Sequence, residues 1–419
     1  MKTRYVAHIT IEAQTPLKIG SNSSDFLQDS PIQKDWNRLP MILGTSIAGV
    51  LRKDFHKNLV DDIFGKENGS KVIISNALLV DENGKVFEEL LLEKTPFLQL
   101  FDTLPIREHT AITDKGVAKE YSKFDEEILY KGTRFKFSIE LIEDTKKNFE
   151  DILSLLSNSS FRIGGGSSKG FGKIKVIEIK TQNFDNNSYE DYSSSLNHSL
   201  SDSYQVVEHN SKEHTIYTLK ITSDDFFMFG SGFGDRDADQ TPIYEKIVDY
   251  KKAKLSENMV LIPASSIKGA LAHRTTYHYN LQKKYFIGDE DAKQTIKELF
   301  GEAKNSKDDI DGLKGKIIFS DVFQKNKNEL KTFDHVGIDR FTGGTLDGAL
   351  FQEKTIAQKD EFEIEIVVEN GIQECYIKAF ETALNDICNG MLALGGTTTK
   401  GNGVFSGTLY IDGEHYEKK

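Results

Sequence analysis

The sequence predicts an α+β fold arranged as two tandem halves, and three observations lead to this prediction. The chain has 419 residues, which suits two domains of about 200 residues each. A series of short motifs occurs twice in the same order along the chain. Each half contains many alternating, strand-like segments and few helix-like ones, a mixture typical of the α+β class. We therefore expect a first domain at 1–182, a linker at 183–214 and a second domain at 215–419.

The composition argues against several classes of protein. No apolar run is long enough to span a membrane, and the alternating N-terminus is unlike the continuous apolar core of a signal peptide. Cys375 and Cys388 are the only cysteines, so neither a disulfide framework nor a cysteine-ligated zinc site is expected, and we predict a cytoplasmic protein. The net charge of −12 opposes nonspecific binding to nucleic acid, because phosphates are repelled at long range.

The first repeated motif predicts a helix in each half. The matching residues of the two copies are Ser46 and Ser266, Ile47 and Ile267, and Gly49 and Gly269. A hydroxyl residue ahead of an apolar-periodic run is typical of a helix N-cap, so Ser46 and Ser266 are expected to cap these helices. Each helix then leads, after an insertion, to a Phe-Gly dipeptide.

The second repeated motif is a glycine-rich segment with a lysine near its end, at 164–172 and at 395–403. Lys169 of the first copy matches Lys400 of the second, and a strand-like run follows each copy. A nucleotide P-loop would open a helix instead, so ATP binding is disfavoured. Two interpretations remain: a simple turn between helix and strand, or a backbone cradle in which lysine contacts RNA phosphates.

The third motif is an acidic loop that precedes a proline, at 25–35 and at 235–246. Asp29 lies in the first copy, and Asp237 and Asp239 lie in the second. A carboxylate beside bound RNA is able to hold Mg²⁺ or to act as a general base towards a 2′-hydroxyl group. A solvated acidic turn is the alternative interpretation.

An irregular region follows in each half, from Arg107 to about Lys131 and from His335 to about Lys354. Each contains a histidine near its start and leads to a strand-like run, which predicts a projecting hairpin. Arg340 and Phe341 are candidates to contact a phosphate and an unpaired base. A structural role is the alternative for His109 and His335.

In combination, these motifs resemble the RAMP superfamily of CRISPR proteins, and the resemblance covers nearly the whole chain twice. Within that superfamily, the chain looks like a fused double-backbone subunit of a type III effector complex, III-D-like and related to the Csm and Cmr types. The resemblance implies two modified RNA-recognition-motif (ferredoxin-like) domains with projecting thumb hairpins. It also implies a CRISPR guide RNA, a complementary target RNA and other effector subunits as partners.

The resemblance further implies Mg²⁺-dependent cleavage of the target RNA, in which a 2′-hydroxyl group attacks the adjacent phosphate. The expected catalytic residue is the aspartate before Ser-Pro, which is Asp29. The second half departs from this pattern, because Gln240 aligns with Asp29 while Asp239 and Asp237 lie just before it. Asp29 and Asp239 are therefore the expected metal ligands, and Asp237 is a third catalytic candidate.

The same comparison suggests the RNA-binding residues. They are Ser46, Gly49, Arg52, His109, Gly165, Lys169, Ser266, Lys268, Arg274, His335, Arg340, Phe341, Gly396 and Lys400. At the position of Lys268 the first half carries Ala48, so contact with the guide is expected to differ there. Two other functions remain open: a backbone subunit that binds guide RNA without cutting, and a metal-independent processing nuclease that uses histidine.

Overall fold

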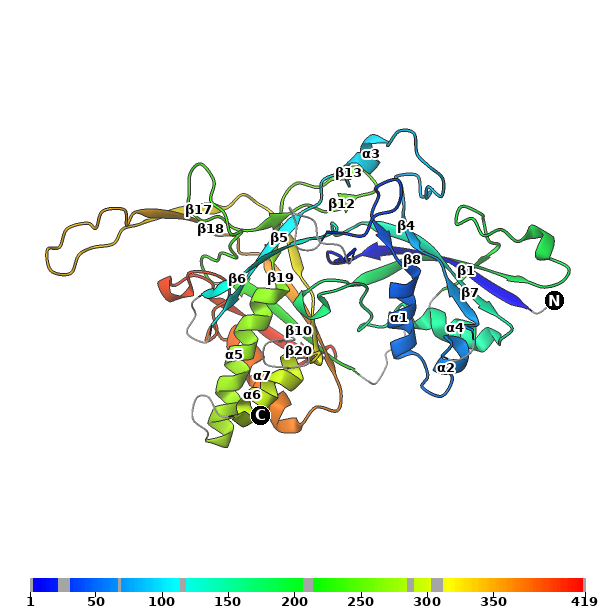
Figure 1. Ribbon diagram of the computed structural model, residues 1–419. Helices are drawn as coiled ribbons and strands as arrows, with labels where there is room; N and C mark the ends of the chain where they lie inside the picture. Colours follow the sequence, from blue (N-terminus) through cyan, green and yellow to red (C-terminus); the bar gives the residue numbers. More distant parts are fainter. Residues whose placement is uncertain are drawn as a thin grey trace.

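The computed structural model describes residues 3–21, 31–66, 69–113, 118–205, 214–284, 290–302 and 312–416. Figure 1 shows two halves side by side, each with an antiparallel sheet and helices packed against it. The mixed class predicted from the sequence is confirmed in this strand-rich fold with few helices. None of the helices in the described ranges is long and apolar enough to cross a membrane.

The first half is built on one twisted sheet with the strand order β2-β4-β7-β1-β8-β9, and β3 also pairs with β7. Its strands are β1 (Arg4–Ala13), β2 (Met41–Ile42), β3 (Val72–Ile74), β4 (Ala77–Leu79), β7 (Arg134–Ile142), β8 (Ile174–Phe184) and β9 (Asp202–Ser203). Its helices are α1 (Gly44–Asp54), α2 (Val60–Ile63), α3 (Pro96–Gln99) and α4 (Lys146–Leu155).

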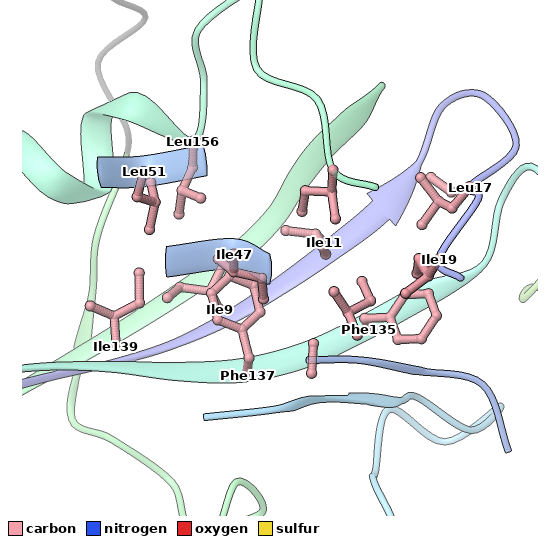
Figure 2. Close-up of a cluster of buried hydrophobic side chains, with 14 of the residues drawn as sticks. Ile9, Ile11, Leu17, Ile19, Ile47, Leu51, Phe135, Phe137, Ile139 and Leu156 are labelled. Carbon is pink, nitrogen blue, oxygen red and sulfur yellow. The ribbon is translucent and has the colours of Figure 1, made fainter. Parts of the chain in front are cut away.

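The core of the first half lies between the sheet and helices α1 and α4. Alternate residues of β1 and β7 face this core, as the two-residue period of a strand requires. Figure 2 shows Ile9 and Ile11 from β1 and Phe137 from β7 packed against Ile47 and Leu51 of α1. All five side chains are buried, so each contributes roughly 1.5–3 kcal/mol through the hydrophobic effect.

The second half repeats this arrangement with strand order β15-β19-β10-β20-β21 and a small sheet β11-β14-β16. Its strands are β10 (His214–Ser223), β11 (Tyr244–Glu245), β12 (Val248–Asp249), β13 (Lys254–Leu255), β14 (Met259–Ile262), β15 (Ile317–Phe319), β16 (Val322–Lys325), β19 (Glu361–Glu369), β20 (Phe405–Ile411) and β21 (Glu414–His415). Its helices are α5 (Ala264–Lys283), α6 (Glu290–Phe300) and α7 (Glu374–Cys388). Six main elements share the order strand, helix, strand, strand, helix, strand in the two halves: β1, α1, β3, β7, α4 and β8 in the first, and β10, α5, β15, β19, α7 and β20 in the second.

Each half also carries a β-hairpin. The first hairpin is formed by β5 (Ile106–Ile112) and β6 (Ala118–Glu127), and the second by β17 (Leu330–His335) and β18 (Phe351–Ile356). The sequence placed the start of the second hairpin at His335. In the structure its first strand begins earlier, at Leu330. In Figure 1 the second hairpin extends away from the body, whereas the first lies against the second half.

The serine N-caps predicted for the two helices are wrong. Helix α1 begins at Gly44 and α5 at Ala264, so Ser46 and Ser266 lie in the first turn. The cap comes instead from the strand pair next to each helix. The Asn76 side chain accepts a hydrogen bond from the Gly44 N–H at 2.9 Å, and Asp321 accepts one from Ala264 at 2.8 Å. Because these partners lie far along the sequence, local spacing did not reveal them.

The segment between the halves packs against the first half over its described part. It contains the end of β8, the 3₁₀ turn η2 (Tyr189–Asp191) and β9, which pairs with β8. Leu196 packs with Val80 and Val86 of the first half, and Leu200 packs with Phe184. Residues 183–205, which the sequence assigned to a linker, thus form part of the first half's surface.

Candidate RNA-binding interface

The two glycine-rich loops have the same backbone conformation. Each contains a 3₁₀ turn, η1 (Ser167–Lys169) or η3 (Thr398–Lys400), flanked by residues with positive φ. Glycine is required at Gly164, because a Cβ there would lie 2.3 Å from the carbonyl oxygen of Lys18. This glycine therefore lets the loop pack against the chain beneath it.

Both loops are anchored through the second glycine of the motif. Gly165 donates its N–H to Lys18 O at 2.8 Å, and Gly396 donates its N–H to Met228 O at 2.7 Å. The backbone N–H groups of Gly165 and Gly396 are therefore used within the protein. RNA binding by these two glycines stays a prediction.

A buried glutamate brings the predicted histidine and lysine of the first half together. Glu126 is almost fully buried at the base of the first hairpin. His109 Nε2 lies 3.2 Å from its carboxylate, Lys169 Nζ lies 3.5 Å away, and Lys18 forms a short ion pair with it. Phe124 stacks on His109, and the Lys169 ammonium lies over its ring at 4.7 Å from the centroid. We call His109, Phe124, Glu126 and Lys169 the first glutamate site.

The second half repeats this site with the same residue types. His335 Nε2 lies 3.2 Å from the buried carboxylate of Glu353, and Lys400 Nζ lies 3.7 Å from it. Phe351 stacks on His335, and the Lys400 ammonium lies 4.2 Å from the centroid of that ring. In both hairpins the histidine and the phenylalanine are cross-strand partners. We call His335, Phe351, Glu353 and Lys400 the second glutamate site.

The sequence pointed to both histidines and both lysines but missed the glutamates and the stacked phenylalanines. The available signal was a Phe-x-Glu pattern that occurs once in each irregular region, at 124–126 and 351–353. Acidic residues are frequent throughout these regions, so the pattern did not stand out. Only the hairpin pairing shows that both glutamates face the glycine-rich loop.

The first glutamate site keeps its carboxylate ionised. Burial alone would raise the pKa of Glu126, but the contacts from His109 and Lys18, together with the charge of Lys169, lower this pKa to about 2. The carboxylate therefore holds the lysine at a defined place near the surface. The side chain of Lys169 is 37% exposed, as is that of Lys400, so each ammonium is able to donate to one further anion.

The first glycine-rich loop also meets helix α5 of the second half. Lys268 Nζ donates a hydrogen bond to the Ser168 hydroxyl at 3.1 Å. Burial, followed by the charge of Lys169, lowers the pKa of Lys268 to about 8. Lys18 and Lys169 thus surround Glu126, and Lys268 of the second half lies close enough to Lys169 for the two charges to repel.

Two of the predicted RNA-binding arginines have structural partners. Arg52 donates to Gly65 O at 2.7 Å and pairs with Asp61 at 2.9 Å, which ties α1 to the turn after α2. Arg274 pairs with Asp386 of α7 at 2.5 Å. These contacts give both arginines a role in helix packing.

The remaining candidates on the two helices lie at the surface. Ser46 is exposed and Ser266 is partly exposed, and among the described residues none approaches within 4 Å of a Cβ built on Gly49. At the tip of the second hairpin Phe341 is 99% exposed, and Arg340 is exposed beside it. The first hairpin carries Tyr121, which is fully exposed and which the sequence interpretation missed. Each hairpin therefore presents an aromatic ring that is free to stack on a base.

The acidic loop of the second half is attached to the second hairpin. Asp239 accepts a hydrogen bond from the Gln352 N–H at 2.8 Å, and Asp235 and Asp237 pair with Lys354 at 2.5 and 3.2 Å. Asp29 lies outside the described residues. No group of three metal-ligating side chains occurs in the part of the chain that the structure describes.

Strand pairing changes the alignment of the two acidic loops. Gly20 forms a bridge with Ile32, and Gly230 forms the equivalent bridge with Pro242. Counted back from these bridges, position 29 corresponds to Asp239 and not to Gln240. Aligning Pro31 with Pro242 shifts this correspondence by one residue and places Gln240 opposite Asp29.

The described carboxylates do not form a Mg²⁺ site by themselves. One oxygen of Asp239 accepts a backbone hydrogen bond, and Asp235 and Asp237 share the ammonium group of Lys354. Magnesium in nucleic-acid enzymes usually takes one or two carboxylates together with substrate phosphates and water. The Mg²⁺ cofactor therefore stays a prediction.

The fold and the repeated site define a duplicated α+β protein in which each half presents a carboxylate-held lysine beside a hairpin. The family model of the RAMP superfamily matches residues 10–175 and 218–406, so the chain belongs to that superfamily. A comparison with curated proteins finds no match. Membership indicates an RNA-binding role associated with CRISPR, and the two matched ranges coincide with the two structural halves.

Proposed function

We propose that this protein is a guide-RNA-binding backbone subunit of a type III CRISPR effector complex, III-D-like in being a fused pair. The observation that carries the proposal is the occurrence of the same glutamate site in both halves. A structural ion pair alone would not need a surface lysine, a stacked aromatic ring and a hairpin to recur together. RNA phosphates suit the exposed lysine, and exposed aromatic rings suit unpaired bases.

In this proposal each half is a ferredoxin-like domain, which the order strand, helix, two strands, helix, strand supports. The guide RNA runs past both glycine-rich loops, and Lys169 and Lys400 each contact one phosphate. The two hairpins act as thumbs that separate the guide–target duplex at regular intervals. The acidic residues elsewhere on the chain face away from the RNA or meet other subunits.

We also propose that the assembled complex cleaves target RNA beside Asp29 and beside Asp239. The 2′-hydroxyl oxygen forms a bond to the adjacent phosphorus, the bond from phosphorus to the 5′-oxygen breaks, and the departing 5′-oxygen takes a proton from water. The aspartate assists removal of the 2′-hydroxyl proton, and the hairpin holds the nucleotide in line. When bound, Mg²⁺ would supply neutralisation of phosphate charge.

A second candidate function is a backbone subunit that binds guide RNA without cutting. The contacts of Asp239, Asp235 and Asp237 with the second hairpin favour it for the second half, because they also explain these aspartates as hairpin supports. Mapping of target fragments separates the two candidates.

Cross-linking of a guide RNA tests the binding function. A guide with photoreactive nucleotides is bound to the full chain in its complex, and the attached peptides are identified by mass spectrometry. The expected attachment points are the loop at 164–172 and the loop at 395–403.

The lowered pKa of Lys268 predicts a pH dependence of RNA binding. Phosphates favour the charged lysine, and the free protein loses this proton as the pH rises through about 8. We expect the affinity for guide RNA to fall severalfold between about pH 7 and about pH 9. Lys268→Arg keeps its charge throughout this range, so its affinity is expected to stay nearly constant. Binding titrations at constant ionic strength measure both profiles, and a flat wild-type profile would contradict the assignment.

A further inference from the structure

The two halves are joined by an ionic interface centred on Arg107. This side chain is 2% exposed and extends from β5 into the second half. Its guanidinium group donates to Glu245 at 2.6 and 2.8 Å and to Asp321 at 2.6 Å. Asp321 also caps α5 at Ala264, so one carboxylate links the first hairpin to the helix start of the second half.

Other cations of the first half contact the second half around Arg107. Lys173 pairs with Glu365 at 2.6 Å, Arg162 donates to the Ser320 hydroxyl at 3.2 Å, and the Lys131 ammonium lies 4.9 Å from the centroid of the Phe323 ring. The first half thus presents cations, and the second half receives them with carboxylates, a hydroxyl group and an aromatic ring.

The duplication allows the outward face of the second half to be compared with this contact surface. Arg107 lies opposite Glu126 in the first hairpin, and Phe333 lies opposite Glu353 in the second. The pairing of the other strands and the hydrogen bonds of the glycine-rich loops show which residues of the second half are equivalent to Lys131, Arg162 and Lys173. In the second half the positions of Arg107, Arg162 and Lys173 are taken by the partly exposed Phe333, Ala393 and Val404, and the position of Lys131 is taken by Gln358, which is fully buried. None of these four residues is charged.

The outward face of the first half is the counterpart of the surface that receives Arg107. Lys34 forms a β-bridge with Pro40, and Tyr244 pairs with Val260 at the equivalent place in the second half. Asp35, the residue after Lys34, therefore corresponds to Glu245, the residue after Tyr244. Asn76 caps α1 as Asp321 caps α5, so these two residues also correspond.

Asp35 and Asn76 line one hollow of about 460 Å³, together with Trp36, Leu78 and Phe87. Trp36 is 70% exposed, although tryptophan is rarely left in solvent without a partner. Burial raises the pKa of Asp35, whose carboxylate accepts backbone N–H groups from Asn37 and Leu39. The hollow therefore offers the Asp35 carboxylate, the Asn76 amide and apolar walls, with Lys34 and Glu88 also in its lining, at the place where the second half holds a guanidinium group.

We propose that this hollow receives the hairpin of a neighbouring subunit that is a different chain of the same fold, carrying Arg or Lys at the position of Arg107. The neighbouring hairpin would form the same kind of interface as the one between the two halves, because Asp35 and Asn76 correspond to Glu245 and Asp321, which bind Arg107. This inference rests on the proposed function only in requiring neighbouring subunits, and it does not depend on RNA binding or cleavage.

A second copy of this chain does not fit the hollow. Its second hairpin would place Phe333 over Asp35, which would remove this carboxylate from water without supplying the guanidinium group that Glu245 receives from Arg107. A foreign hairpin with Arg or Lys pairs with Asp35 and packs its stem against Trp36. The residues at the two outward faces therefore discourage self-assembly and favour a defined neighbour.

The proposal is tested by supplying the missing cation. Analytical ultracentrifugation of the full chain without RNA is expected to show a monomer for the wild type and for Phe333→Leu. Phe333→Arg is expected to associate head to tail, with a dissociation constant lower by about tenfold or more. Adding Asp35→Asn to Phe333→Arg is expected to restore the monomer. A monomeric Phe333→Arg protein would overturn the proposal, because the hollow would then not select a cation.

A photoreactive amino acid in place of Trp36 gives a second measurement on the assembled complex. The expected cross-link joins position 36 to a hairpin of a different subunit, with Arg or Lys at the equivalent of position 107. A cross-link to residues 330–356 of another copy of this chain would overturn the proposal, as would self-association of the wild type that Asp35→Asn leaves unchanged. RNA binding of each variant, measured separately, shows whether the proposed function fails independently.

Discussion

Asp239→Asn is expected to remove one discrete cut from the target RNA, and Asp29→Asn is expected to remove another. The asparagine keeps the shape and the acceptor oxygen that Gln352 N–H contacts, but it loses the charge needed to assist proton transfer. Loss of general-base assistance typically lowers a rate by about 10²- to 10⁴-fold. The fragments are mapped at nucleotide resolution with the assembled complex.

Asp237→Asn is the matched control for this experiment. Asp237 pairs with Lys354 and lies at the surface, two residues before Asp239. The alignment by strand pairing assigns catalysis to Asp239, so the control is expected to leave every cut in place. Loss of a cut in Asp237→Asn with none lost in Asp239→Asn would show that the alignment is wrong. Unchanged cutting in Asp29→Asn and Asp239→Asn would instead favour the subunit that binds without cleaving.

Arg107→Ala is expected to lower the free energy of unfolding by about 3–5 kcal/mol, as breaking a buried ion pair does. Burial alone would lower the pKa of Arg107, but Asp321 and Glu245 outweigh it and raise this pKa, so the guanidinium group remains charged. Its removal leaves two buried carboxylates without a cation, which is the main cost. Urea denaturation measures the loss, and the two halves are expected to unfold in more separate steps.

Two variants make the Arg107 measurement specific. Lys146→Ala breaks an exposed pair with Glu150 and is expected to cost less than about 1 kcal/mol. Adding Asp321→Asn to Arg107→Ala removes one unpaired carboxylate and is expected to recover part of the stability. An Arg107→Ala protein as stable as the wild type would contradict the assignment of this network to the junction.

The duplication was visible in the sequence because its motifs are local. Gly-rich turns and hydroxyl residues ahead of an apolar run carry their own backbone preferences, so their repetition survives divergence of the residues between them. The mixed class, the repeated strands and the hairpins followed from these local patterns. The segments at 17–20 and 227–230, which alternate like strands, form only isolated bridges, because the chain turns there towards the glycine-rich loop.

The parts that escaped prediction depend on residues far apart in the chain. Glu126 meets Lys169 across 43 positions, and Arg107 meets Asp321 across the two halves. The prediction of the helix caps was wrong for the same reason, because Asn76 and Asp321 contact the starts of α1 and α5 from the ends of neighbouring strands. The partners of Arg52 and Arg274, which are Asp61 and Asp386 on neighbouring helices, were likewise not visible in the sequence.

The central claim is that one guide RNA contacts two equivalent sites on this chain. Cross-linking of a photoreactive guide to the wild type, to Lys169→Ala and to Lys400→Ala tests it most directly. We expect two attachment points on the wild-type protein, one on each glycine-rich loop, separated along the RNA by one regular interval. Each variant should lose only its own attachment point. Cross-links confined to one half, or unchanged cross-links in both variants, would contradict the claim.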